Sequence, residues 1–268
     1  MPEFYQGVCP LWVLERGKPD LIGSSTLLLV EQARFLITAA HVIDAAMSRA
    51  LLVGNPRGFR QIGGSGKLTK LPISGLRSAD QDDTAVIALD EDTASFIEEA
   101  NAPLPIQYTD GNNSSSPGKL YEFFGCPWRK VDSAKPRIFG PNIYKFKSGS
   151  VAKADYDSLG LSPHKHIAVE LHLKKVTDGQ GRAVTAPCPE GMSGGPVWSF
   201  IPINRDGQQM WTRRLAGITI EYRSKTQTLI GVRINAALEC IRIMIPSLSP
   251  SIPATPKTTI ICRNHSDE

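Results

Sequence analysis

Residues 190–198 read EGMSGGPVW and place Ser193, Gly194, Gly195 and Pro196 directly before an apolar, strand-like run. Glycines at such a point indicate a backbone that turns tightly or comes close to another group. A serine among them is either a turn residue or a nucleophile presented at the end of a strand. The remainder of the chain has to decide between the two.

Short apolar runs of strand character recur along the whole chain. Most are rich in β-branched or aromatic residues and are separated by Gly, Pro, Asn or Ser, which predicts an all-β barrel or sandwich. The predicted strands lie at residues 8–14, 25–30, 33–43, 50–55, 84–89, 120–126, 148–154, 166–173, 195–200, 214–222 and 228–234.

Helical periodicity is confined to two segments, 93–100 and 235–245. In the second, apolar residues at spacings of three and four share one face, and Asn235 can cap its start. The Pro- and Ser-rich residues 246–257 then predict an extended or disordered tail. Residues 110–118, DGNNSSSPG, predict a loop that links two halves of the chain.

Composition excludes several classes of protein. The 268 residues are 41% hydrophobic and 21% charged with a net charge of +4, which favours a globular protein and gives no indication of nucleic-acid binding. We find no signal peptide and no apolar run of about 20 residues, so we expect a cytoplasmic protein without membrane contact. Five scattered cysteines without a CxxC pair predict no metal site and a reducing compartment.

Two further segments supply chemistry that would suit a nucleophilic serine. His41 ends the apolar run FLITAAH, and Asp83 precedes the apolar run TAVIAL. A neutral imidazole near pH 7 can take a proton from a serine hydroxyl, and a carboxylate on its other nitrogen fixes the tautomer. The site therefore needs His41, Asp83 and Ser193 together, with Asp82 as the alternative acid.

Other motifs have simpler interpretations. Residues 63–68, GGSGKL, lack the spacing of a phosphate-binding loop and predict a hairpin loop. His164 and His166 lack acidic or cysteine partners at ligand spacing, so we expect a surface strand end there. Cys188 is expected to line a pocket, since the serine motif is complete without a thiol.

The three motifs TAAH, DDTAVIAL and GMSGGPV, in this order, resemble the trypsin-like (chymotrypsin-fold) serine peptidases, as in bacterial stand-alone members. The resemblance extends over about residues 7–245. It implies two packed six-stranded antiparallel β-barrels, at about 7–110 and 118–234, with a C-terminal helix at 235–245 and a tail at 246–268. The spacing typical of the family, with alanine two residues after the aspartate, favours Asp83 over Asp82.

The resemblance also implies an oxyanion hole formed by the backbone amides of Gly191 and Ser193. Two departures from the family stand out. Met192 replaces the aspartate that pairs with a newly cut N-terminus in activated members, so we expect no activation by N-terminal cleavage. Val42 stands where a disulfide-forming cysteine often lies beside the histidine.

The specificity pocket is expected to be lined by residues on three segments of the second barrel. If Arg233 points into the pocket free of Glu221, an acidic or polar substrate residue fits; if the two pair, the pocket is neutral. The expected lining residues are Pro187, Cys188, Thr219, Ile220, Glu221 and Arg233.

The sequence thus predicts a serine endopeptidase that acts on protein or peptide substrates without a cofactor. A free cytosolic protease is hazardous, so we expect restricted substrates or an activating partner protein, by analogy in stress or phage defence. The alternative is a trypsin-like fold without turnover that binds a peptide or a partner.

The pocket residues generate a first prediction. Position 187, at the expected pocket base, is Pro187 rather than the aspartate that selects basic residues. We expect cleavage of a randomised peptide library, read by mass spectrometry, to occur without preference for Lys or Arg before the cut bond. Cleavage strictly after Lys and Arg would contradict this.

Overall fold

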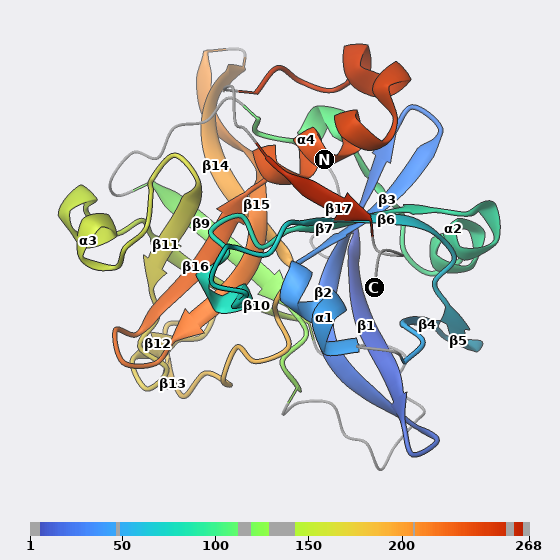
Figure 1. Ribbon diagram of the computed structural model, residues 1–268. Helices are drawn as coiled ribbons and strands as arrows, with labels where there is room; N and C mark the ends of the chain where they lie inside the picture. The colour runs from blue at the N-terminus through green and yellow to red at the C-terminus, as the bar shows by residue number, and fades with distance from the viewer. Residues whose placement is uncertain are drawn as a thin grey trace.

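The computed structural model describes residues 6–46, 49–111, 119–128, 143–205, 207–255 and 260–264. They form two curled antiparallel sheets that pack together, with a helix near the C-terminus beside them (Figure 1). The predicted fold class is confirmed. The predicted linker at 110–118 lies mostly outside the described residues.

The first sheet comes from the N-terminal half of the chain and one strand near its end. Its order is β17-β6-β7-β3-β2-β1-β4-β5, with β8 paired to β2, which makes nine strands among the described residues where six were expected. They are β1 (Val8–Glu15), β2 (Lys18–Val30), β3 (Ala33–Thr38), β4 (Leu52–Asn55), β5 (Gly58–Gln61), β6 (Gly64–Thr69), β7 (Ala85–Leu89), β8 (Leu104–Pro105) and β17 (Cys262–Asn264).

The second sheet has the order β10-β9-β14-β15-β16-β11. A bridge between Ser150 and Val169 brings the ends of its two edge strands together, so the sheet curls on itself. Its strands are β9 (Leu120–Gly125), β10 (Tyr144–Gly149), β11 (His166–Glu170), β14 (Pro196–Arg205), β15 (Gln208–Arg223) and β16 (Thr228–Arg233), and a separate ribbon joins β12 (Val176–Thr177) to β13 (Ala183–Val184).

Helices are short and lie between strands. They are α1 (Ala40–Ala46), α2 (Glu91–Glu98), α3 (Lys153–Ser158), α4 (Asn235–Met244) and the 3-10 turns η1 (Arg77–Ala79), η2 (Ile106–Tyr108) and η4 (Pro246–Ser251). None of the helices in the described part of the chain is long and apolar enough to cross a membrane.

Three local predictions were wrong. Residues 40–43, expected to continue a strand, begin α1, and residues 153–154, also expected in a strand, begin α3, where the Asp155 carboxylate accepts the Ala152 amide. Residues 64–68, expected in a hairpin loop, belong to β6 because they pair with β7 along their whole length. In each case the secondary structure depends on hydrogen bonds that the local composition does not reveal.

The C-terminal segment also differs from expectation. Helix α4 is confirmed, but Ile234 rather than Asn235 is its N-cap, and no side chain caps it. Beyond it, η4 and β17 replace the expected extended or disordered tail over the described residues. β17 pairs antiparallel with β6 and so covers backbone groups that would otherwise lie at the edge of the sheet (Figure 1).

The two sheets meet where residues 191–195 rest against β2 and β3. Gly194 has a φ of 88°, and a Cβ there would overlap the Ser24 carbonyl oxygen and the Thr38 hydroxyl. The Ser24 amide donates to the Ser193 carbonyl at 2.8 Å, and the Thr26 hydroxyl donates to the Gly194 carbonyl at 3.1 Å. A glycine is therefore required at position 194 by the contact between the sheets.

This contact generates a matched pair of variants. Gly194→Ala forces alanine into a left-handed backbone conformation and also makes its Cβ overlap buried atoms. Gly17→Ala, at a φ of 76°, forces the same conformation, but no atom lies within 4 Å of the new Cβ. We expect Gly17→Ala to lower the free energy of unfolding by about 1 kcal/mol and Gly194→Ala by about 3 kcal/mol or more, measured by urea denaturation. Equal losses would contradict the packing account.

Candidate active site

His41 and Asp83 are brought together by the start of α1. His41 Nδ1 lies 2.6 Å from one Asp83 carboxylate oxygen, and the His41 backbone amide donates to the other at 3.0 Å. Asp83 is only 6% exposed. One carboxylate thus caps the helix and orients the ring, which leaves Nε2 as the nitrogen that can act as a base.

The surroundings of His41 shift its pKa in opposing directions. Burial lowers the pKa, while the hydrogen bond and charge of Asp83 raise it, and the net result is a pKa above the usual 6.5. Arg77 lowers the pKa and Asp44 raises it by smaller amounts. The carboxylate therefore stabilises the imidazolium that would form when the ring takes up a proton.

The neighbouring carboxylates are occupied elsewhere. Asp82 pairs with Lys165 at 2.9 Å, and Asp80 pairs with Arg77 at 2.7 Å. Among the described contacts, the carboxylate on the His41 ring is that of Asp83. The geometry therefore favours Asp83 over Asp82, the alternative that sequence reasoning kept open.

Ser193 lies on a segment adjacent to the one that carries His41. Gly23 separates them: a Cβ there would lie 2.6 Å from Val42, the residue after His41, and 3.3 Å from the Ser193 carbonyl oxygen. The hydrogen bond recorded for the Ser193 hydroxyl in the described structure goes to the Ile220 carbonyl at 3.4 Å, not to His41. Nucleophile–base bonds are commonly loose until substrate binds.

The backbone before Ser193 is shaped for close approach. Gly191 has a φ of 91°, and a Cβ there would lie 2.6 Å from the Cys126 carbonyl oxygen and 2.9 Å from the Trp128 amide. No side chain fits at this position without movement of the backbone. The glycine predicted on one side of the oxyanion hole is thus required by local packing.

Amides in this loop divide into two groups. Those of Met192, Gly194 and Gly195 donate to carbonyl oxygens at 2.7–2.9 Å, whereas those of Gly191 and Ser193 have no acceptor among the described residues. This pair is the one expected to hold an oxyanion. Such donors stabilise negative charge that develops on a carbonyl oxygen.

Met192 fixes the loop by packing rather than by charge. Its side chain is fully buried in the core of the second sheet, and a Cβ on Gly125 would lie 2.7 Å from its Cα. Burial of an apolar side chain thus holds the position where an aspartate forms an ion pair in zymogen-activated peptidases.

One solved structure with a similar fold is a serine protease. The chain superposes on neuropsin, a serine protease expressed in the limbic system of mouse brain, with a TM-score of 0.55 and 14% identity over 91% of this chain and 96% of that one. The chain has the chymotrypsin fold. No protein-family model and no curated protein sequence matches it.

Two bacterial proteases are also similar to this chymotrypsin-fold chain. The MamO protease domain of Magnetospirillum magneticum has a TM-score of 0.47 and 10% identity, covering 87% of this chain and 94% of that one. The protease Anisep of Arthrobacter nicotinovorans has a TM-score of 0.49 and 14% identity, covering 85% and 90%.

The expected pocket residues are only partly brought together. Thr219 and Ile220 contact the Ser193 loop through their backbones, and the Thr219 hydroxyl is buried without a partner among the described residues. Glu221 pairs with Arg223 at 2.9 Å. The Glu221–Arg233 pair is not among the described contacts: Arg233 is 3% exposed and donates to the Pro163 carbonyl at 3.0 Å.

Pro187 and Cys188 are half-buried on the segment that leads to Gly191. Sequence reasoning missed Tyr222, which follows Glu221 on β15. Its hydroxyl donates to the Leu171 carbonyl at 3.2 Å, and burial together with nearby Cys188 raises its pKa. The sequence could have indicated Tyr222 as a neighbour of the pocket, because it lies on the same predicted strand as Thr219 and Ile220.

His166 corrects another expectation. It is 1% exposed rather than on the surface, and its Nε2 lies 2.8 Å from the Gln81 carbonyl oxygen. Burial lowers its pKa. Across the described ranges, no three His, Cys, Asp or Glu side chains gather as metal ligands would.

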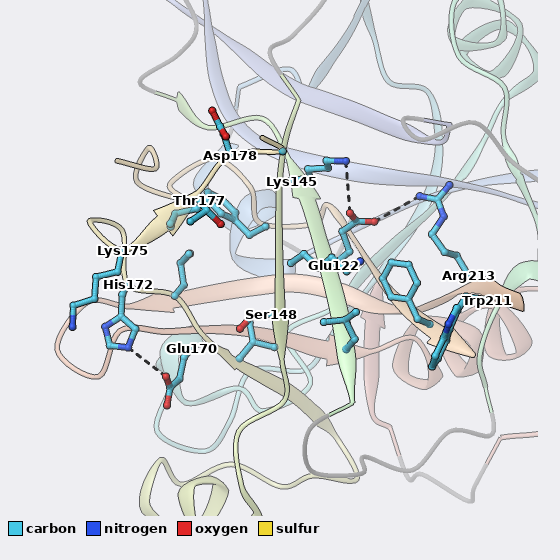
Figure 2. Close-up of a pocket in the computed structure, with 18 residues that line it drawn as sticks. Glu122, Lys145, Ser148, Glu170, His172, Lys175, Thr177, Asp178, Trp211 and Arg213 are labelled. Atoms are coloured by element: carbon cyan, nitrogen blue, oxygen red, sulfur yellow. Dashed lines mark hydrogen bonds and ion pairs between the residues drawn. The ribbon is translucent and has the colours of Figure 1, made fainter. Parts of the chain in front are cut away.

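The second sheet also carries a cavity of about 1270 Å³, shown in Figure 2. Buried Glu122 projects into it between Lys145 at 3.8 Å and Arg213 at 3.7 Å. None of the candidate catalytic or pocket residues lines it. The cavity is therefore separate from the chemistry around His41.

The surroundings of His41 and His166 shift the pKa values of the two rings in opposite directions, and one NMR titration measures both. We expect the NMR titration midpoint of His41 to lie above 6.5, because the imidazolium is stabilised beside Asp83, and that of His166 to lie below it. Asp83→Asn removes the charge and should move only the His41 midpoint downward. A midpoint for His41 that is unchanged by Asp83→Asn would contradict the pairing.

Proposed function

We propose that this chain is a serine endopeptidase that cleaves peptide bonds through an acyl-enzyme. The observation that carries the proposal is the buried Asp83 carboxylate on His41 Nδ1 at 2.6 Å, beside a loop whose Gly191 and Ser193 amides have no described acceptor. The chymotrypsin fold supports it. No cofactor is needed for this chemistry.

In the proposed reaction, Ser193 Oγ attacks the peptide carbonyl while His41 Nε2 takes its proton. The amides of Gly191 and Ser193 hold the oxyanion. The imidazolium, stabilised by Asp83, then donates its proton to the leaving amine. Water enters, gives a proton to His41, and releases the acyl group from Ser193 with the serine hydroxyl restored.

The proposal includes control of this site by substrate or by a partner protein. The Ser193 hydroxyl donates to the Ile220 carbonyl at 3.4 Å, and attack on a substrate needs this hydroxyl to donate to His41 instead. Binding of a substrate backbone or a partner can supply that change. We further propose a cytoplasmic setting, which the free thiols of Cys9, Cys126 and Cys188 support.

A second candidate is a binding module of the same fold without turnover. The same Ser193–Ile220 bond favours it, since a serine held away from its base is not activated. The intact His41–Asp83 pair favours the peptidase, because a binding module has no need for a carboxylate on the histidine ring.

A fluorophosphonate probe distinguishes the two candidates without knowledge of the substrate. We expect one adduct on Ser193 by intact-mass spectrometry and none on Ser193→Ala, because only an activated serine reacts. Asp83→Asn should slow labelling by about 10³–10⁴-fold, since the wrong tautomer of His41 is then favoured.

Asp82→Asn is the matched control, because it removes the adjacent carboxylate, whose described partner is Lys165. We expect it to change the labelling rate by no more than a few-fold. Equal loss in both variants would sink the assignment of Asp83. Absence of any adduct on the wild type would favour either a latent peptidase that requires its partner or the binding module.

A further inference from the structure

Two cysteines outside the candidate site lie in direct contact. Cys240 is on α4 and Cys262 is on β17, and their sulfurs are 2.9 Å apart with both thiols free. They join the C-terminal helix to the last strand of the first sheet. A sulfur–sulfur bond of about 2.05 Å needs only a small further approach.

The two thiols differ in a way that suits stepwise oxidation. Cys262 is partly exposed, and the hydrogen bond from Cys240 together with nearby Lys67 lowers its pKa. Cys240 is buried, and its pKa is raised. By contrast, burial raises the pKa of Cys9 and of Cys126 to about 12, so neither is a competing nucleophile.

β17 is connected through β6 to the segment that carries Asp83. Cys262 pairs with Thr69 on β6. The Thr69 amide donates to the Thr84 carbonyl at 2.9 Å, and the Thr84 amide donates to the Thr69 hydroxyl at 3.1 Å. Because Thr84 directly follows Asp83, the position of β17 bears on the backbone that presents the carboxylate.

β17 also contacts the helix that carries His41. Arg263 donates to one oxygen of Asp44 at 3.2 Å, and Arg77 donates to the other at 2.7 Å. Asp44 is three residues after His41 on α1. Arg77 in turn pairs with Asp80 at 2.7 Å, so an ion-pair network runs from β17 to both sides of the candidate acid–base pair.

We propose that Cys240 and Cys262 form a reversible disulfide that fixes β17 to α4 and so holds the supports of His41 and Asp83 in place. The described strand is only three residues long, so few backbone hydrogen bonds hold it against β6 and a covalent tether would add to its stability. The disulfide itself does not depend on the proposed peptidase function; its effect on the site does.

Hydrogen peroxide is a sufficient oxidant. The Cys262 thiolate attacks one peroxide oxygen, the O–O bond breaks, and a sulfenic acid and hydroxide form. Cys240 sulfur then attacks the sulfenic sulfur, the S–O bond breaks, and its proton leaves with the hydroxyl group as water. Overall, two thiols lose two electrons and two protons to one peroxide, which becomes two waters; a dithiol reductant reverses the change.

The link is tested on the full chain after mild peroxide treatment, alkylation of remaining thiols and trypsin digestion. We expect residues 234–242 joined to 258–263, with the mass of two hydrogens lost, and separation of the two peptides by dithiothreitol. Cys262→Ser should abolish the link, whereas Cys9→Ala, which keeps the pair, should retain it. Oxidation of Cys262 to sulfinic acid without a link would overturn the proposal.

Consequences of the link are read from stability and from labelling. We expect oxidation to raise the Tm of the wild type by about 5 °C or more and to leave that of Cys262→Ser unchanged. The temperature at which fluorophosphonate labelling of Ser193 is lost should rise with it. A disulfide that leaves Tm unchanged would refute the stabilisation of β17 on α4. A higher Tm, with no change in the temperature at which labelling is lost, would refute the effect of the disulfide on the site. If no labelling occurs in either state, the chain alone is not an active peptidase, while the mass and Tm results still decide the disulfide.

Discussion

The close contact of Gly194 with Ser24 and Thr38 is the constraint on which the rest of the structure depends. It joins the two sheets at a point where a single Cβ would overlap backbone and hydroxyl oxygens. Ser24 makes three further hydrogen bonds. Its amide donates to the Ser193 carbonyl, and its hydroxyl donates to the Gly191 carbonyl and accepts from the Cys126 amide. Because the loop is held from the first sheet, Ser193 is presented beside the segment of His41.

Asp83 meets two requirements with one carboxylate. It accepts the His41 backbone amide hydrogen in the first turn of α1 with one oxygen, and its other oxygen contacts the His41 ring. A hydrogen bond to a charged group contributes about 1.5–3 kcal/mol, which helps to offset burial of the carboxylate. Structural and chemical roles coincide, so the helix that positions the imidazole cannot form in this way without the group that orients it.

Much of this arrangement is readable from the sequence, and the exceptions share a cause. Most strands are recognisable because their alternation and punctuation are local. Helix α1 is not, because its first turn is stabilised by Asp83, which is 42 residues distant from His41. Strand β6 and the C-terminal β17 form by pairing across the sheet, and His166 is buried by contact with Gln81. Composition at these positions gives no sign of the distant partner.

The candidate site shows the same division. His41, Asp83 and Ser193 were found from three motifs in order, and the structure joins the first two directly. Arg77, Asp44 and Arg263 were not found, because they act through an ion-pair network whose members come from three separate segments. The pocket was also less readable, since Arg233 is buried with a hydrogen bond to the Pro163 carbonyl and Glu221 pairs with Arg223.

The central claim is that the docked loop and the His41–Asp83 pair form one catalytic site. A crystal structure of the fluorophosphonate-treated protein tests it most directly. The account predicts a phosphorus–oxygen bond to Ser193 Oγ, a phosphoryl oxygen within hydrogen-bond distance of the Gly191 and Ser193 amides, and Nε2 of His41 facing the adduct. An adduct on another residue, or a phosphoryl oxygen turned away from both amides, would contradict it.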